Sequence, residues 1–244
     1  MPPKTRIVQI ESLSFTYPDG TKALDGISLD VCEGECVGLI GPNGAGKTTL
    51  LLHLNGILRG NGRVIVDGVE VSEKSLRVIR QKVGVVFQDP DDQLFSLTVS
   101  DDIAFGPISM KLPRGEVATR VEAAVRHAGL EGLEGKAPNR LSFGQKKKAS
   151  LAAVLSMRPR VIALDEPTSN MDPRSRRGFL RLIGGLDATK ILSTHDIESV
   201  LELCDRVVVL DAGRVVALGE TRELLADRAL MEAHGLDVPP ALRS

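Results

Sequence analysis

Residues 41–48 read GPNGAGKT, which matches the phosphate-loop pattern G-x-x-x-x-G-K-[ST]. The run before it, ECVGLIG (35–41), is apolar and ends in glycine, as a buried strand entering a loop does. The run after it, TTLLLHLNGIL (48–58), has the length and apolar face of a helix. A glycine-rich turn with a chance lysine explains neither neighbour. The order of strand, loop and helix therefore predicts an α/β fold that binds phosphate.

This loop supplies the groups that a nucleotide phosphate needs. Its glycines let main-chain amides turn toward a phosphate without a Cβ in the way, and the helix that follows adds its positive end. Lys47 is expected to reach the β- and γ-phosphates, and the Thr48 hydroxyl to ligate Mg²⁺. The residues expected to bind the nucleotide here are Gly41, Pro42, Asn43, Gly44, Ala45, Gly46, Lys47, Thr48 and Thr49.

A second apolar run, VIALDEP (161–167), contains two adjacent acids. A carboxylate is expensive inside a sheet, whereas the carboxyl end of a strand in an open α/β sheet faces the ligand crevice. Asp165 is therefore expected to hold Mg²⁺, directly or through water, and Glu166 to act as general base on the attacking water. Two acids in a turn also suit a plain solvated loop, but the phosphate loop makes that interpretation the weaker one.

Composition limits the class of protein. The chain has 244 residues, with 31 basic and 32 acidic side chains and a formal net charge of −1, so no global field favours nucleic acid or an anionic membrane. Its three cysteines make no disulfide framework and complete no zinc pattern. No run approaches the ~20 apolar residues of a membrane span, and MPPKTRIVQI lacks the apolar core of a signal peptide. We therefore expect a cytoplasmic protein that binds no nucleic acid.

The spacing of apolar residues divides the chain into a strand-rich core and a helical insert. Residues 6–17 and 27–32 alternate apolar and polar side chains, whereas residues 97–157 keep apolar side chains at helical spacing. The charge run Lys146–Lys148 is expected to form a solvated face. We expect one domain, residues 1–244, with its core in 1–88 and 161–219, a helical subdomain in 89–160, and a C-terminal helix and tail in 220–244.

A third motif, LSFGQ (141–145), lies between the other two. From about Tyr17 to Gly219 the chain resembles the ATP-binding-cassette (ABC) ATPases, and its motifs follow that family's order. They are an early aromatic, the phosphate loop, a glutamine after a strand, LSFGQ, VIALDEP, SNMD (169–172) and a histidine after KILST (190–194). The resemblance implies an ATPase that uses ATP and Mg²⁺. It also implies a P-loop NTPase (RecA-like) core with an N-terminal antiparallel β subdomain and an inserted α-helical subdomain.

The resemblance further assigns roles to single residues. It implies that Tyr17 stacks on adenine, that Gln88 couples Mg²⁺ and the attacking water to a partner protein, and that His195 senses the γ-phosphate. Lys47, Gln88, Glu166 and His195 are thus the implied catalytic residues, and Thr48, Gln88 and Asp165 the implied Mg²⁺ site.

The LSFGQ motif also implies a second subunit. Ser142 precedes an expected helix, whose N-terminus is a natural anion site, and the family uses this motif to bind the ATP of the other chain. The residues assigned to this shared site are Ser142, Gly144, Gln145 and Asp172, and the implied assembly is a homodimer. Phe143 stands where the commonest signature has glycine, and SNMD departs from the commoner forms of its loop. We expect these changes to alter the surface between subunits while nucleotide binding is kept.

The stretch FQDPDDQLFS (87–96) combines acids with an apolar pair. In ABC ATPases this segment borders a groove that receives a coupling helix of the membrane protein, and apolar contact beside charge suits such a groove. With SDDIAFGP (100–107) it resembles the energy-coupling-factor ATPases, and its Asp-Pro-Asp-Asp form resembles their cobalt/nickel importers. The expected docking residues are Asp89, Asp91, Asp92, Gln93, Leu94 and Phe95. The alternative is a mobile acidic loop with Leu94 and Phe95 in the core.

The resulting hypothesis is the ATPase subunit of an energy-coupling-factor importer for cobalt or nickel. We expect it at the cytoplasmic face of the membrane, as a peripheral partner of a transmembrane coupling protein and a substrate-binding membrane component. A vitamin importer or another ABC transporter shares every catalytic residue and stays open as an alternative. A soluble mechanical or scaffold ABC ATPase would insert long coiled coils, for which the segment between Gln88 and LSFGQ is too short. A module without turnover is disfavoured by Glu166 and His195.

Overall fold

A six-stranded sheet forms the centre of the protein, seen in a computed structural model that describes residues 5–243. The expected domain ends at residues 1 and 244 lie outside the described residues. The strand order is β10-β9-β3-β8-β7-β6, parallel throughout except that β10 pairs antiparallel with β9. These strands are β3 (Cys36–Ile40), β6 (Val83–Val86), β7 (Val161–Asp165), β8 (Thr189–Ser193), β9 (Arg206–Asp211) and β10 (Arg214–Glu220).

A second, antiparallel sheet carries the N-terminal part of the chain. Its order is β2-β1-β4-β5, formed by β1 (Arg6–Thr16), β2 (Lys22–Cys32), β4 (Asn61–Val66) and β5 (Val69–Glu70). The turn between β1 and β2 is closed by Asp19, whose carboxylate accepts the Thr21 amide at 2.9 Å. Strand β2 alternates buried and more exposed side chains from Gly26 to Cys32, as its sequence predicts, whereas β1 does so only from Val8 to Glu11, because a register irregularity between Ile10 and Leu13 interrupts it.

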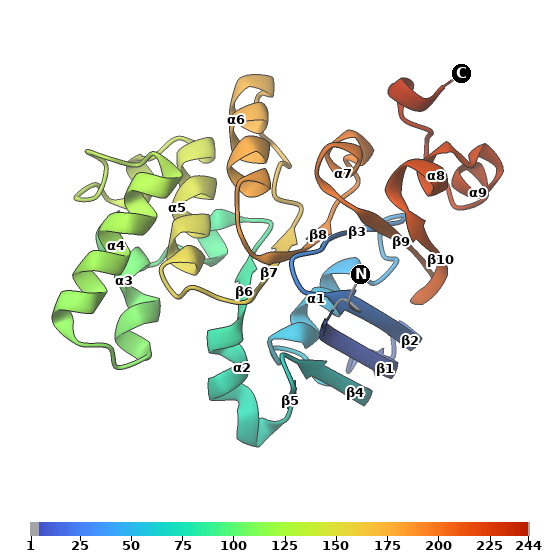
Figure 1. The fold of residues 1–244 in the computed structure, drawn as a ribbon, viewed down its shortest axis with the longest axis horizontal. Helices are drawn as coiled ribbons and strands as arrows, with labels where there is room; N and C mark the ends of the chain where they lie inside the picture. The colour runs from blue at the N-terminus through green and yellow to red at the C-terminus, as the bar shows by residue number, and fades with distance from the viewer. Residues whose placement is uncertain (1–4, 244) are drawn as a thin grey trace.

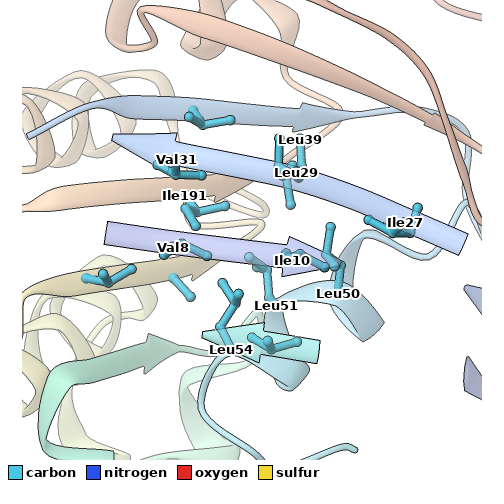
Figure 2. Packing of buried hydrophobic residues seen from close by; sticks show 14 of the residues in the cluster. Val8, Ile10, Ile27, Leu29, Val31, Leu39, Leu50, Leu51, Leu54 and Ile191 are labelled. Atoms are coloured by element: carbon cyan, nitrogen blue, oxygen red, sulfur yellow. The ribbon is translucent and has the colours of Figure 1, made fainter. Parts of the chain in front are cut away.

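Helix α1 (Lys47–Leu54) lies between the two sheets. Figure 2 shows Leu50, Leu51 and Leu54 of this helix beside Val8 and Ile10 of β1. The same apolar cluster contains residues of β3, β7 and β8, so α1 is buried on two sides. Because α1 starts at the phosphate loop, this packing fixes the loop to both sheets.

The opposite face of the six-stranded sheet is covered by helices from the second half of the chain (Figure 1). They are α6 (Pro173–Gly184), α7 (Ile197–Leu203), α8 (Thr221–Ala226) and α9 (Arg228–Ala233). Along β7, Val161 and Ala163 face one cluster, and Ile162 and Leu164 the other. The single C-terminal helix expected from the sequence is two helices, because Asp227 adopts an extended conformation and caps α9 by accepting the Leu230 amide.

Three helices form the expected insert: α3 (Val99–Ser109), α4 (Arg114–Ala128) and α5 (Phe143–Leu155). They share a separate apolar cluster and lie to one side of the sheets, in green and yellow in Figure 1. Helix α2 (Leu76–Lys82) was not anticipated; it packs Ile79 into the core beside β6. Short 3₁₀ turns are η1 (Glu73–Ser75), η2 (Pro90–Asp92), η3 (Pro138–Arg140) and η4 (Pro240–Leu242). Within residues 5–243, no helix combines the length and apolarity needed to cross a membrane.

The contact between β6 and α5 joins the insert to the core, and Gly84 makes it possible. A Cβ at Gly84 would lie 2.2 Å from Cγ1 of Val154, which is itself buried. We expect Gly84→Ala to lower the free energy of unfolding by about 1–3 kcal/mol through overpacking. Chemical denaturation followed by circular dichroism measures this change.

Gly115 on α4 provides the matched control. A Cβ there meets no heavy atom within 4 Å. Gly115→Ala should therefore be neutral or stabilise the fold by up to about 1 kcal/mol, because alanine is the better helix former. Equal effects of the two substitutions would contradict the close approach of β6 and α5.

Candidate functional site

The phosphate loop is held in a shape that requires glycine. Gly46, the N-cap of α1, has φ +100°. A Cβ there would lie 2.5 Å from the carbonyl oxygen of Ala23, so both the backbone angle and the space exclude other residues. Asn43, Gly44 and Thr48 are exposed, which leaves this side of the loop open to a ligand.

Lys47 lies beneath the loop and is buried. Its Nζ donates to the carbonyl oxygens of Gly41 at 2.7 Å and Pro42 at 3.0 Å. Burial lowers the pKa of Lys47, and the carboxylates of Glu166 and Asp165 oppose that shift. A cation held in this way is ready to meet a phosphate that arrives from the open side.

Thr48 and Asp165 bring two hard oxygen groups together. The Thr48 hydroxyl lies 2.8 Å from Oδ2 and 3.0 Å from Oδ1 of Asp165, at the carboxyl end of β7. Burial raises the pKa of Asp165, hydrogen bonds from Thr48 and Ser193 oppose this, and the neighbouring Glu166 charge adds to it. A buried carboxylate beside a hydroxyl is a donor set that Mg²⁺ prefers, so the residues present fit this ion.

Glu166 is held by three contacts from the loop after β8. Its Oε2 accepts the Thr194 hydroxyl at 3.0 Å, its Oε1 accepts the His195 amide at 3.0 Å, and Oε2 lies 2.9 Å from Nδ1 of His195. Glu166 also has φ +41°, which is unusual for a residue with a side chain. The carboxylate is thus fixed, and the side chain of His195 beside it is 67% exposed.

Tyr17 reaches the phosphate loop from the N-terminal sheet. Its hydroxyl lies 3.0 Å from Oγ1 of Thr49, and its ring meets the edge of Phe15 at 4.9 Å between centroids. Phe15 in turn meets His53, whose Nδ1 lies 2.7 Å from the Thr49 carbonyl oxygen. These four contacts connect Tyr17, Thr49, His53 and Phe15 in a closed circuit between α1 and the end of β1, and they determine where the Tyr17 side chain lies.

These parts enclose a cavity of about 530 Å³. It brings together most of the residues that the sequence analysis assigned to the nucleotide, and Gln88, Glu166 and His195 with them. Asp165 lines a second, smaller hollow of about 380 Å³. Thr48 and Gln88 line both this hollow and the first cavity. The lining residues that the sequence analysis missed are Thr21, Lys22, Ala23 and Ser193 in the first, and Phe87, Phe143 and Asn170 in the second.

The residues assigned to a shared site lie outside the first cavity. Ser142 is the exposed N-cap of α5, and it forms a capping box with Gln145. A Cβ at Gly144 would lie 3.3 Å from Ser175, so this glycine packs on α6. Asp172 caps α6 by accepting the amides of Arg174 and Ser175. The predicted helix start at Ser142 is confirmed, and this group is not joined to the phosphate loop of its own chain.

The segment after Gln88 corrects one of our predictions. Asp89, Asp91 and Asp92 are exposed, but Leu94 is buried in the apolar cluster of the helical insert. The expectation that Leu94 offers an apolar contact to a partner is therefore wrong. The Gln93 side chain also turns inward, since Nε2 donates to the Ser150 carbonyl at 2.8 Å.

Phe95, in contrast, is 68% exposed, so the alternative of a buried pair is also wrong. Its ring meets Phe105 of α3 edge-to-face at 5.0 Å, and Leu97 close by in the chain is exposed as well. Phe95, Leu97 and Phe105 are called the apolar patch below. Asp102, which is buried, accepts the amides of Phe95 and Ser96 and so fixes the loop that carries the patch.

Lys147 contradicts the expected solvated face of Lys146–Lys148. It is fully buried and donates to the carbonyl oxygens of Gln88 at 2.6 Å and Glu166 at 3.1 Å. Burial lowers its pKa to about 8, although the carboxylates of Asp165, Asp89 and Glu166 oppose the shift. A sequence signal existed: Lys147, Leu151 and Val154 share one helical face, and all three are buried.

Comparison with known proteins adds to this geometry. A family model described as ABC transporter matches residues 24–169. An energy-coupling factor transporter ATP-binding protein of Carboxydothermus hydrogenoformans is 48% identical over 95% of this chain and 87% of its own. The chain belongs to the ABC transporter family. A protein with the same description from Methanocaldococcus jannaschii is 45% identical over 96% of this chain and 86% of its own.

Solved structures agree with this assignment. The structure of cbiO1 from Clostridium perfringens, described as part of the ABC transporter complex cbiONQ, has a TM-score of 0.82 and 41% identity, over 93% of this chain and 94% of that one. A dimeric ATP-binding cassette in a post-hydrolysis state, bound to ADP and Pi, has a TM-score of 0.80 and 27% identity, and the match covers 88% of this chain and 99% of that one. The P-loop NTPase fold, the ATPase activity and the resemblance to energy-coupling-factor ATP-binding subunits are thereby confirmed.

The loop that holds Glu166 is itself fixed by Asp196, which follows His195. Asp196 caps α7 and accepts two hydrogen bonds from Arg176, at 2.7 and 2.8 Å. Burial opposes ionisation, but the hydrogen bonds from Arg176 and Ser199 outweigh it and lower the pKa of Asp196 from 3.8 to about 2. The ionised carboxylate therefore stabilises the fold fully above pH ~4, and this contribution is lost as the pH falls toward 2.

We expect Asp196→Asn to lower the free energy of unfolding by about 2 kcal/mol at pH 7. The difference from the unmodified protein should shrink between pH 4 and pH 2.5, as measured by urea unfolding at several pH values. Glu198→Gln, which changes an exposed acid on the same helix, serves as the control and should have little effect. A deficit of equal size at pH 7 and pH 3 would contradict the assigned pKa.

Proposed function

We propose that the chain powers an energy-coupling-factor importer, by hydrolysing ATP in the cavity between Tyr17, the phosphate loop, Gln88, Glu166 and His195. The observation that carries the proposal is the meeting of these parts around one space of about 530 Å³. Together they supply groups that phosphoryl transfer needs: the cation of Lys47, the hydroxyl of Thr48, the carboxylate of Glu166 and the imidazole of His195. Catalysis would be mostly positioning and electrostatics.

Lys47 would exchange its hydrogen bonds to Gly41 and Pro42 for the β- and γ-phosphates. Thr48 and Asp165 would hold Mg²⁺ in the smaller hollow, which Gln88 also lines. The ion would supply charge neutralisation on the phosphates. Tyr17, positioned by Thr49 and Phe15, would cover the adenine.

Glu166 would polarise the attacking water. In the structure, Nδ1 of His195 lies beside one carboxylate oxygen of Glu166. If His195 turns to the γ-phosphate, that oxygen loses a partner and gains room for a water molecule. Binding of ATP would thus release the general base at the moment when it is needed, which links the roles of these two residues.

A second copy of the chain would complete the site. Ser142 lies exposed at a helix N-terminus and does not line the cavity of its own chain, which supports its use on the nucleotide of a partner. A similar solved structure is a dimer. We therefore propose a homodimer in which Ser142, Gly144 and Gln145 of each copy, with Asp172 nearby, meet the other copy's ATP.

The apolar patch would dock a coupling helix of a transmembrane partner. Phe95 and Phe105 offer an exposed aromatic pair, and Asp92, exposed three residues before Phe95 in the chain, offers charge. Asp91 is already paired with Lys146 at 2.6 Å, so Asp92 is the acid better placed to meet a basic residue. Through this contact the chain would lie at the cytoplasmic face of the membrane.

Cobalt or nickel is the proposed cargo, with a vitamin as the alternative. The proposal rests on the Asp-Pro-Asp-Asp form of the docking segment and on similarity to a subunit of the cbiONQ complex. A substrate-binding membrane component would select the cargo. Among residues 5–243, no group of three or more His, Cys, Asp or Glu side chains is arranged to hold a metal ion.

Glu166→Gln tests the chemical role of the carboxylate. The variant should bind ATP with unchanged affinity, because Lys47 and the loop amides are intact, yet lose ~10²–10⁴-fold in turnover. Release of inorganic phosphate measures the turnover, and a fluorescent ATP analogue measures the affinity. Turnover near the normal rate would remove Glu166 from the mechanism.

Phe95→Ser combined with Leu97→Ser, at two exposed residues of the apolar patch that line neither hollow, tests docking. We expect co-purification of a membrane protein with the tagged chain to be lost, together with uptake of labelled cobalt, nickel or vitamin, while ATP affinity stays the same. Val78→Ser, at an exposed apolar residue of α2, is the control and should leave both intact. A double variant that still recovers its membrane partner would place docking elsewhere.

A further inference from the structure

Lys147 has an unusual position for a charged side chain. It is among the largest fully buried side chains of the described residues, and it lies on α5, the helix that begins in the LSFGQ motif. A buried ammonium is expensive unless its hydrogen bonds are satisfied, and an apolar side chain of similar volume would fill the same space with less penalty. Its presence therefore calls for an explanation beyond packing.

The two acceptors of Lys147 belong to two different catalytic loops. One is the carbonyl oxygen of Gln88, which follows β6, and the other is that of Glu166, which follows β7. The ammonium also lies 5.8 Å from the ring centroid of Phe143, at the first turn of α5. One side chain thus joins the signature helix, the glutamine loop and the loop of the general base.

The residue before Lys147 connects α5 to the docking segment. Nζ of Lys146 lies 2.6 and 2.9 Å from the two carboxylate oxygens of Asp91. Asp91 is three residues from Gln88 and four from Phe95. Two consecutive lysines of α5 therefore hold the segment 88–95, which leads to the apolar patch: Lys147 binds Gln88 at its start, and Lys146 binds Asp91 in its middle.

We propose that Lys147 is a positioning residue for ATP hydrolysis, which sets the places of Gln88 and Glu166 by binding their main-chain carbonyls to helix α5. A shift of α5, or of the segment docked on it, then moves both loops together instead of one alone. The inference rests on the proposed role of Glu166 in hydrolysis and adds the residue that keeps it aligned.

The geometry of Glu166 makes this link specific to catalysis. Its carboxylate is held by Thr194 and His195, and its carbonyl oxygen by Lys147 and the Ser169 hydroxyl. With φ +41° its backbone is in a sparsely populated region and needs such contacts to stay there. Removing the ammonium leaves the carbonyl with its donors from Ser169 but breaks its link to α5, so the backbone that carries the carboxylate is held less firmly, while the phosphate loop and Lys47 are untouched.

Lys147→Met tests the proposal, because methionine fills the space without a donor. We expect the kcat for ATP hydrolysis to fall by ~10²-fold, the size of effect that a small misplacement of a catalytic group produces, with ATP affinity within about twofold of normal. Lys147→Arg keeps the donors and should recover part of the loss. Lys148→Met is the matched control: its ammonium lies beside Gly129, away from both loops, and kcat should not change.

Affinity for a fluorescent ATP analogue and the thermal unfolding midpoint, measured on the same samples, separate positioning from folding. A folded Lys147→Met with normal kcat overturns the proposal, and so does a variant whose ATP affinity falls as much as its kcat. Should Lys147→Met fail to fold, Lys147→Gln carries the same test, since its shorter amide cannot reach both carbonyls. Glu166→Gln is assayed in parallel: if it stays active, the proposed general base is wrong, whereas an inactive Glu166→Gln beside an active Lys147→Met overturns only the role of Lys147.

Discussion

Neutralising charge at the ends of two buried strands is the constraint on which the rest of the structure depends. β3 delivers Lys47 through the phosphate loop, and β7 delivers Asp165 and Glu166, all of them buried. Each of these charges is costly to bury alone: burial lowers the pKa of Lys47 and raises the pKa of Asp165, and the carboxylates of Glu166 and Asp165 oppose the shift at Lys47. The loops therefore have to meet, and the cavity for a nucleotide forms where they do.

The helical insert is tied to this centre by both apolar packing and charge. Its three helices share an apolar cluster of their own, and Leu151 and Val154 of α5 also belong to the cluster on the helix-covered face of the central sheet. Lys146 and Lys147 add polar links, to Asp91 and to the carbonyls of Gln88 and Glu166. Helix α5 is therefore the element through which the insert and the core are joined.

Sequence reasoning succeeded where a local pattern carries its own physical cause. GPNGAGKT between two apolar runs predicted a strand, a loop and a helix, and Ser142 ahead of QKKKASLAAVL predicted a helix N-terminus. It failed where a side chain's environment is set by distant segments. Leu94 and Phe95 are adjacent apolar residues, yet Leu94 lies in the core of the insert and Phe95 is exposed to solvent. The hydrogen bond from the Phe95 amide to Asp102 of α3 fixes the loop in this orientation. The charge of Lys147 favoured a solvated side chain, whereas its position on the same helical face as Leu151 and Val154 indicates burial, which is what the structure shows.

The apolar patch has a consequence for how the cell must make this protein. Aromatic side chains left uncovered on a folded surface attract any other uncovered apolar surface, including another copy of the same patch. Under the proposed docking, a subunit synthesised in excess of its membrane partner would keep this patch uncovered and be prone to self-association. Matched synthesis of the two proteins, or early assembly at the membrane, would protect the chain during the interval before its patch is covered.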